Sequence, residues 1–229
     1  QCGHMYWRYF MWNFAGRQND IQGEGEIENG NWVSGISFID NARLGDQDNL
    51  PKSMQNPGHT EYYFLPLILG LIGLFYQINK KPEDAWIVFL LFFMTGLAIV
   101  MYLNQTPYQP RERDYAYAGS FYAFAIWIGF GVLYLTELAQ KVIKNKTVAA
   151  SSVGILCLLI PVLMGAQGWE GHNRSGKTSA LDWGKNYLTN LEPNAVIFTR
   201  GDNDTFPLWY VQEVEEYRTD VRVANFMLS

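Results

Sequence analysis

Four uncharged apolar runs dominate the middle of the chain. They occupy residues 62–79, 85–103, 119–135 and 148–166, and none contains Asp, Glu, Lys or Arg. Each is close to the roughly 20 residues that a helix needs to cross the hydrocarbon core of a bilayer. Four buried helices of a large soluble protein are the weaker alternative, because soluble cores seldom hold four runs of this length. The pattern predicts a mainly α protein with a four-span transmembrane helical domain.

The short loops between these runs differ in charge. Loops 80–84 and 136–147 lie on one side of the predicted membrane and hold five lysines, whereas loop 104–118 on the other side holds Arg111 and Arg113. Loops rich in positive charge stay in the cytoplasm. The lysine side is therefore predicted to be cytoplasmic, which places both ends of the chain on the outer face.

The segment before the first run, residues 1–61, begins with dense aromatic residues at near-helical spacing, from Tyr6 to Phe14. Two interpretations stay open: an amphipathic helix lying at the membrane interface, or a helix packed under an outer domain. Residues 23–60 read as loops and turns, with one short element near residues 32–39.

The last segment, residues 167–229, has a different pattern. A helix is predicted over residues 178–191, then a strand at 195–199, a helix at 206–217 and a strand at 221–226. This alternation is typical of the start of an α/β domain. Because about sixty residues bury little surface, we expect the chain to be an internal piece of a larger protein that continues this domain.

Composition excludes several classes of protein. A net charge of -5 leaves no excess of Lys and Arg to neutralise phosphates, so no nucleic-acid partner is expected. The 16% of aromatic residues and the two cysteines, Cys2 and Cys157, argue against a disordered chain and against a disulfide scaffold. The three histidines are too scattered along the chain to form a ligand set.

Residues 171–178 (GHNRSGKT) fit the P-loop pattern G-x-x-x-x-G-K-[ST]. In a P-loop, Lys177 would contact phosphate oxygens and Thr178 would bind magnesium. A P-loop follows a buried strand, whereas this string follows a predicted membrane span, so ATP binding is not expected. The favoured alternative is a polar linker in which Thr178 or Ser179 caps the next helix.

Asp202 and Asp204 form a D-x-D string after a predicted strand. Two nearby carboxylates can begin a metal site, and α/β proteins place ligands at the carboxyl ends of strands. The favoured interpretation is simpler: Asp204 or Thr205 caps a helix that has Pro207 in its first turn. No divalent metal is therefore expected.

The loop before the third run is charged and aromatic, and Pro110 precedes its charged residues. Arg111 and Arg113 are suited to clamp a phosphate with bidentate hydrogen bonds. Glu112 and Asp114 would hold those arginines or take part in acid–base chemistry. The alternative is an interfacial network of salt bridges that fixes the helix ends.

Four long strings, at residues 5–20, 31–40, 102–117 and 201–210, carry a resemblance to a known family. They resemble a family of large bacterial multi-pass membrane proteins, once described only as a domain of unknown function. That family is grouped with the transmembrane protein O-mannosyltransferases, which are glycosyltransferases of the GT-C type. The resemblance extends over essentially the whole chain.

The resemblance implies a hexosyltransferase of the bacterial inner membrane with a periplasmic domain. It would pass a sugar from a polyprenyl-phosphate donor to hydroxyls of an acceptor protein, in contact with the lipid bilayer and without a further cofactor. The catalytic Asp of such enzymes lies in an earlier outer loop, so none is assigned in this chain. Arg111 and Arg113 would bind the donor phosphate. The surrounding cavity would be lined or supported by Glu112, Asp114, Tyr115, Tyr117, Tyr6, Trp7, Arg8, Arg17, Asn19 and Asp20.

Two other functions compete with transfer. A non-catalytic membrane scaffold would use its outer α/β domain to bind a protein partner. A transporter is the weakest alternative, because no predicted span carries a charge that would couple to transport.

Overall fold

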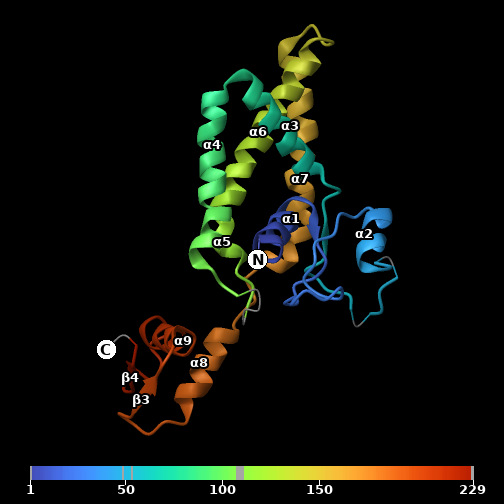
Figure 1. Cartoon of the computed structure of the whole chain (residues 1–229). Helices are drawn as coiled ribbons and strands as arrows, with labels where there is room; N and C mark the ends of the chain where they lie inside the picture. The colour runs from blue at the N-terminus through green and yellow to red at the C-terminus, as the bar shows by residue number, and fades with distance from the viewer. Residues whose placement is uncertain (1, 48, 53, 107–110, 228–229) are drawn as a thin grey trace. The chain divides into compact units, whose positions relative to one another are not determined.

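The computed structural model describes residues 2–47, 49–52, 54–106 and 111–227. It divides into two compact units, Gln1–His172 and Asn173–Ser229. Most described residues are helical, and the short strands form two separate two-stranded sheets (Figure 1). Each unit is described by itself below.

The first unit is built on a bundle of long apolar helices that run side by side (Figure 1). Proline begins α4, and Glu83 and Asp84 in its first turn suit the positive end of the helix dipole. In chain order the bundle consists of α3 (Leu65–Lys80), α4 (Pro82–Met94), α5 (Leu97–Leu103), the 3-10 turn η2 (Asp114–Tyr117), α6 (Ala118–Gln140) and α7 (Lys146–His172).

Three helical stretches of the bundle are long and apolar enough to cross a membrane: Pro82–Leu103, Asp114–Gln140 and Lys146–His172. The fourth expected span, α3, is apolar but has only 16 residues. Large apolar side chains on α4 and α7, such as Trp86 and Leu156, are exposed, as expected for surfaces that face lipid. The chain is therefore a membrane protein.

The structure changes the ends and the continuity of the expected spans. α6 continues past the apolar run through Glu137, and α7 begins at Lys146 and ends at His172, because a charged residue at a membrane boundary does not end a helix. The second span is interrupted between α4 and α5. A Cβ at Gly96 would lie 2.6 Å from the ring of Tyr6, so the break occurs where another helix packs against the backbone.

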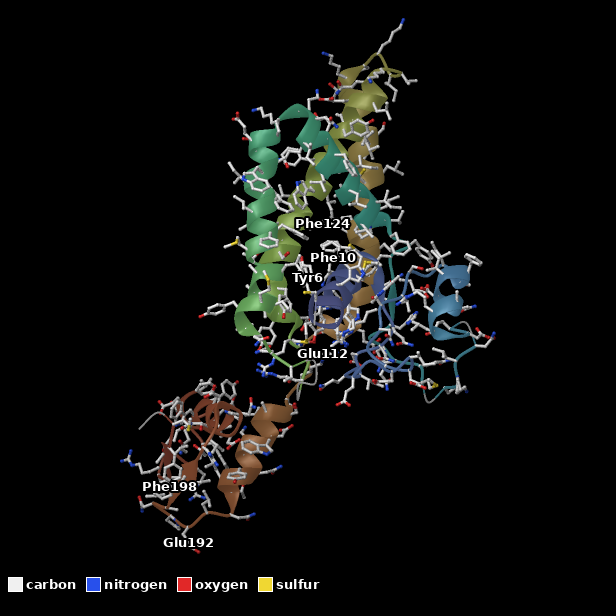
Figure 2. All side chains as sticks on the ribbon, viewed as in Figure 1. Tyr6, Phe10, Glu112, Phe124, Glu192 and Phe198 are labelled. Atoms are coloured by element: carbon white, nitrogen blue, oxygen red, sulfur yellow. The ribbon has the colours of Figure 1, made fainter. Side chains whose placement is uncertain are left out.

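That other helix is the aromatic segment at the start of the chain. It consists of a π-helical turn η1 (Gly3–Trp7) followed by α1 (Arg8–Phe14), and it belongs to the core of the bundle. Figure 2 shows Tyr6 and Phe10 close to Phe124 of α6, and the rings of Phe10 and Phe124 meet edge to face at 4.9 Å. The interface interpretation is therefore replaced by a buried helix, because aromatic side chains surround its axis.

The rest of residues 1–61 consists of loops joined by short elements. β1 (Gly16–Arg17) pairs antiparallel with β2 (Thr60–Glu61). The short element expected near residues 32–39 is a helix, α2 (Ser37–Leu44), that begins later. The buried carboxylate of Asp40 in α2 accepts hydrogen bonds from the backbone N–H groups of Ser34 and Gly35, which fixes the loop before the helix.

The two ends of the bundle differ in charge. The Lys80 ammonium lies 3.2 Å from the Glu137 carboxylate, so the lysine-bearing loops after α3 and after α6 share one end. The first helix, α1, and the turn η2 lie at the opposite end (Figure 1). The predicted charge asymmetry of the loops thus corresponds to two distinct ends of one bundle.

The second unit is a small α/β assembly of α8 (Ser179–Thr189), β3 (Val196–Thr199), α9 (Asp202–Glu213) and β4 (Arg222–Asn225). The strands are parallel, with Val196 opposite Arg222 and Thr199 opposite Asn225. Its core is small and apolar and consists of Leu188, Leu208, Val211 and Val221. The predicted order of elements is confirmed.

Two predicted helix caps are wrong. Thr178 precedes α8, but its hydroxyl donates to the Asp182 carboxylate at 2.8 Å and caps no backbone N–H. α9 begins at Asp202, four residues before the expected start, so Thr205 lies inside the helix and its hydroxyl donates to the carbonyl of Gly201. Pro207 is likewise inside α9 and beyond the first turn, and Asp204 makes no cap.

Candidate functional site

The charged residues of the first unit meet where α1 contacts the segment that precedes η2. Arg8 projects from α1, and Glu112 lies in that segment, at the end of the bundle away from the lysine loops (Figure 2). The guanidinium donates to both carboxylate oxygens, with Nη1 3.0 Å from Oε1 and Nη2 2.7 Å from Oε2. Both side chains are largely buried, with 8% and 15% of their surfaces exposed. The pair is a bidentate ion pair inside the protein.

Two further donors reach the same carboxylate. The Tyr9 hydroxyl donates to Oε2, and the backbone N–H of Gly23 donates to Oε1 at 3.1 Å. Burial raises the pKa of Glu112, but the hydrogen bonds from Arg8, Tyr9 and Gly23 outweigh it, so the pKa lies below its ordinary value. Burial and the neighbouring carboxylate raise the pKa of Tyr9. Glu112 is therefore ionised and Tyr9 protonated at neutral pH.

Arg8 has further partners within the protein. Its Nη1 donates to the carbonyl of Gly30 at 3.0 Å, and its Nε donates to the carbonyl of His4 at 3.2 Å. The guanidinium also lies 4.7 Å from the ring centre of Tyr9. Gly30 has φ +64°, and a Cβ there would meet the guanidinium at 3.0 Å, so glycine allows the loop to approach Arg8.

Arg17 and Arg113 differ from Arg8 in their hydrogen bonding. In the described part of the chain, the buried Nε of each has no hydrogen-bond partner. The Arg17 guanidinium lies over the ring of Trp12, 4.0 Å from its centre, and Nη1 of Arg113 donates to the Tyr115 hydroxyl at 2.9 Å. Buried donors in native proteins are normally satisfied, so each of these two nitrogens lacks an acceptor that such a donor usually has.

Arg17 interacts electrostatically with the segment 111–114. Burial lowers the pKa of Arg17, and the carboxylates of Asp114, Asp20 and Glu112 oppose that shift. Asp114 and Glu112 are the neighbours of Arg113 in sequence. Arg17 and the segment that contains Arg113 therefore lie within electrostatic reach of each other.

The other predicted residues of the site lie around this cluster. Arg111 is exposed, with its guanidinium 5.7 Å from the ring centre of Tyr115. Tyr117 is buried and packs against Tyr6 and Tyr9. The structure thus separates an exposed arginine–tyrosine pair from a tyrosine that belongs to the core.

Trp7 and Asp20 lie at the edge of the cluster. Trp7 is 50% exposed and stacks on Phe10, and Asp20 is exposed. Asn19 is buried, and its amide oxygen accepts from the backbone N–H of Gly30 at 2.9 Å. Pro110, which precedes the charged residues 111–114 in the sequence, lies outside the described residues.

Sequence reasoning missed the partner of Glu112. This residue was expected to hold Arg111 and Arg113, but its carboxylate is occupied by Arg8, Tyr9 and the Gly23 amide. The available signal was a single arginine within an aromatic helix, because a buried charge requires a partner.

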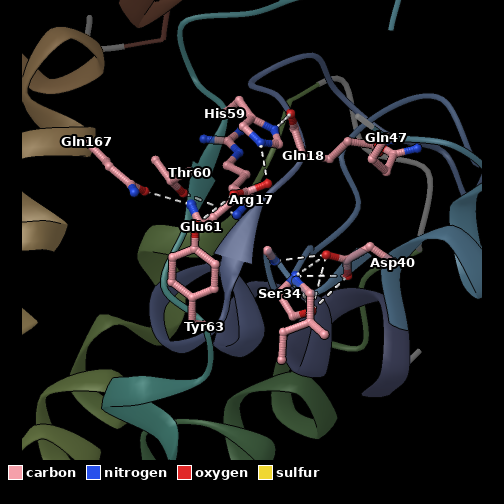
Figure 3. A network of polar contacts seen from close by, with 12 residues as sticks. Arg17, Gln18, Ser34, Asp40, Gln47, His59, Thr60, Glu61, Tyr63 and Gln167 are labelled. Carbon is pink, nitrogen blue, oxygen red and sulfur yellow. Dashed lines mark hydrogen bonds and ion pairs between the residues drawn. The ribbon is translucent and has the colours of Figure 1, made fainter. Parts of the chain in front are cut away.

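A second polar network joins β2 to α7 of the bundle (Figure 3). The His59 ring lies between two acceptor oxygens, with Nδ1 2.9 Å from the carbonyl oxygen of Gln18 and Nε2 3.0 Å from Oε1 of Glu61. The backbone N–H of Glu61 donates to the side-chain oxygen of Gln167 in α7 at 2.7 Å. These contacts hold β2 against α7, and β2 pairs with β1, which contains Arg17.

The bundle has an apolar groove of about 550 Å³ that is lined by α3, α7 and Leu135 of α6. It extends from Leu65, the first residue of α3, to Ile72, and α7 contributes the segment from Leu156 to Leu163. Its lining is apolar throughout, with Cys157 as the most polar member. Hydrocarbon is the matching ligand for such a surface.

Two motifs from the sequence remain, the D-x-D string and the P-loop-like string. Asp202 and Asp204 are exposed in the first turn of α9, and the described residues contain no cluster of three or more His, Cys, Asp or Glu side chains with metal-binding geometry. In the P-loop-like string, Gly171 and His172 end α7, and Thr178 precedes α8. A helix rather than a strand therefore leads into the string.

Comparison with known families gives one match, and it falls in the second unit. Residues 180–229 match the family model TMEM260-associated domain 2. The match begins within α8 and includes both strands and α9. Comparisons with curated proteins and with solved structures give no match. A membrane bundle thus precedes a unit similar to TMEM260-associated domain 2.

Proposed function

We propose that this chain is part of an integral membrane glycosyltransferase of the GT-C type, and that the arginine cluster binds the phosphate of a polyprenyl-phosphate sugar. The observation that carries the proposal is the pair of buried, unpartnered Nε atoms of Arg17 and Arg113 in the described part of the chain. A phosphate oxygen is the acceptor that such donors lack.

The chemistry of the cluster favours a phosphate over a neutral ligand. Guanidinium groups stay charged and present planar sets of donors that fit phosphate oxygens. Glu112 neutralises Arg8 through a bidentate pair, whereas Arg113 bonds to the neutral hydroxyl of Tyr115. Arg111, beside the ring of Tyr115, adds an exposed positive charge two residues before Arg113.

The surroundings favour a ligand that carries a lipid chain. The cluster lies at one end of a membrane bundle, and the apolar groove begins at Leu65, the first residue of α3. A polyprenyl phosphate combines one anionic group with a long hydrocarbon chain. The arginine cluster suits the anionic group, and the apolar groove suits the hydrocarbon chain.

Glu112 is not the general base in this proposal. A base must hold a free lone pair for the proton of the acceptor, and a pKa near the operating pH favours transfer. The carboxylate of Glu112 already accepts from Arg8, Tyr9 and Gly23, and its pKa lies below the ordinary value. Glu112 is a supporting residue, and the sugar, the acceptor and the base are left to experiment.

The proposal is tested by transfer from polyprenyl-phosphate mannose to envelope proteins, with the intact membrane protein. Replacing Arg111 and Arg113 together with Ala is expected to lower the rate at least about a hundredfold, because the donor phosphate loses its charged partners. The control replaces Lys141 and Lys144, at the other end of the bundle, and should keep the rate. Unchanged transfer by the arginine variant at normal expression contradicts the assigned role. No transfer by the wild type favours the scaffold.

A further inference from the structure

We propose that Glu112 is a positioning residue, which fastens the segment 111–114 to α1 and thereby sets the direction of the Arg113 guanidinium toward its anionic ligand. The identity of that ligand rests on the proposed function. The attachment of this segment rests on contacts that one carboxylate makes to two other parts of the chain, α1 and the loop at Gly23.

The carboxylate of Glu112 is the point where these parts converge. Arg8 and Tyr9 reach it from α1, 104 and 103 residues away in sequence, and the Gly23 backbone N–H reaches it from 89 residues away. Hydrogen bonds to a charged acceptor are stronger than those between neutral groups. Removing the carboxylate therefore releases the segment from both α1 and the loop at Gly23.

Tyr9 also holds the residue after Glu112, which is Arg113. Its hydroxyl donates to Oε2 of Glu112 and accepts from the backbone N–H of Arg113 at 3.1 Å. The backbone is thus held at two successive residues. Among the described residues, the Arg113 guanidinium has the hydroxyl of the exposed Tyr115 as its one hydrogen-bond partner, so the held backbone sets where its buried Nε points.

Tyr9→Phe is the most selective test, because it removes only the hydroxyl. The ring would keep its packing against Trp12 and Tyr117, so the variant should fold. We expect about a tenfold increase in the Kd for polyprenyl phosphate in nanodiscs and in the donor KM, with kcat retained. Glu112→Gln should give at least the same change. If Tyr9 and Glu112 had only a structural role, the two substitutions would lower the amount of active protein and leave the Kd unchanged.

Hydrogen exchange provides a readout that is independent of any ligand. The backbone N–H groups of Gly23 and Arg113 are donors in the fastening, so both should exchange at least about tenfold faster in Glu112→Gln. Glu137→Gln is the matched control, because Glu137 also accepts from a tyrosine and a cation, Tyr76 and Lys80, at the other end of the bundle. It should leave both exchange rates and the Kd unchanged.

The outcomes separate the two proposals. Unchanged exchange at Gly23 and Arg113 in Glu112→Gln overturns the fastening, whatever the ligand. Faster exchange with an unchanged Kd, in a protein that binds polyprenyl phosphate, overturns the positioning role. If the wild type binds polyprenyl phosphate but transfers no sugar, the proposed transferase function fails, and a raised Kd in Tyr9→Phe still supports positioning. If the wild type binds none, the ligand and the positioning role fail together.

Discussion

Arg8 and Glu112 form a bidentate ion pair across 104 residues of sequence, with hydrogen bonds of 3.0 and 2.7 Å. One partner lies in the buried helix α1 and the other in the segment that precedes η2. The pair joins the first residues of the chain to the membrane bundle. Among the described residues, Arg17 and Arg113 differ from Arg8 in that each has a buried Nε without a hydrogen-bond partner.

Removing Arg8 is expected to destabilise the first unit strongly. Arg8→Ala leaves the carboxylate of Glu112 largely buried without its cation, which costs roughly 2–4 kcal/mol of unfolding free energy. Thermal unfolding of the protein in detergent measures the loss. Lys80→Ala, which breaks the exposed pair with Glu137, is the control and should have little effect. Equal losses of stability in Arg8→Ala and Lys80→Ala would contradict the claim that burial makes the Arg8–Glu112 pair the more important one.

The ion pair also predicts a dependence of stability on pH. The pKa of folded Glu112 lies below its ordinary value of 4.5, so its ionised form stabilises the fold above that value. The stabilisation is lost as the pH falls through the lower, folded pKa. The Tm difference between wild type and Glu112→Gln should be constant from about pH 6 to 8 and shrink below about pH 4. A difference that grows toward acid pH has the wrong sign for this explanation.

Close packing of α3 against α6 predicts a strong effect at one glycine. A Cβ at Gly73 would overlap the backbone carbonyl of Trp127, whereas a Cβ at Gly129 would have no atom within 4 Å. Gly73→Ala should therefore cost about 1–3 kcal/mol or separate the helices, and Gly129→Ala should be neutral or slightly stabilising. Thermal unfolding of both variants in the same detergent decides the matter. Similar Tm values for the two would show that the helices pack differently.

In the second unit, Arg218 closes the end of α8. Its guanidinium donates to the carbonyls of Leu188 and Glu192, at 2.8 and 3.1 Å, and pairs with Asp220. Arg218→Ala leaves carbonyls at the helix end without a partner, so limited proteolysis should cut near residues 188–192 faster. Arg222→Ala removes an exposed arginine of β4 and is the control. Equal protection in both variants would contradict this role for Arg218.

The sequence pattern predicted the long helices well because the cost of burying charge in a membrane makes each span visible as an uncharged run. It did not predict the break at Gly96, because that break depends on contact with Tyr6 from another part of the chain. The surroundings of α1 stayed undecided for the same reason, between a helix at the membrane interface and a helix packed under an outer domain. Aromatic spacing shows that a helix forms, but it does not show what surrounds the helix.

The site was predicted less well than the fold. Arg111–Asp114 stood out as a charged cluster beside a span, and the structure shows a dense polar cluster there. The pairing of Glu112 with Arg8 was missed, because ion pairs between distant residues leave no local periodic signal. The roles of Tyr9 and Gly23 depend on one hydroxyl and one backbone N–H, which only the folded chain brings to Glu112.

The central claim is that the arginine cluster binds the phosphate of a polyprenyl lipid, and equilibrium binding tests it most directly. Polyprenyl phosphate is titrated into nanodiscs that hold the intact protein, as wild type, Arg17→Gln, Arg113→Gln or Arg43→Gln. Arg43 is the matched control, because it also lies over a tryptophan ring, 3.4 Å from the centre of Trp32. We predict that the first two variants raise the Kd about tenfold or more while Arg43→Gln keeps the wild-type value. Equal Kd values for all four proteins would contradict the account.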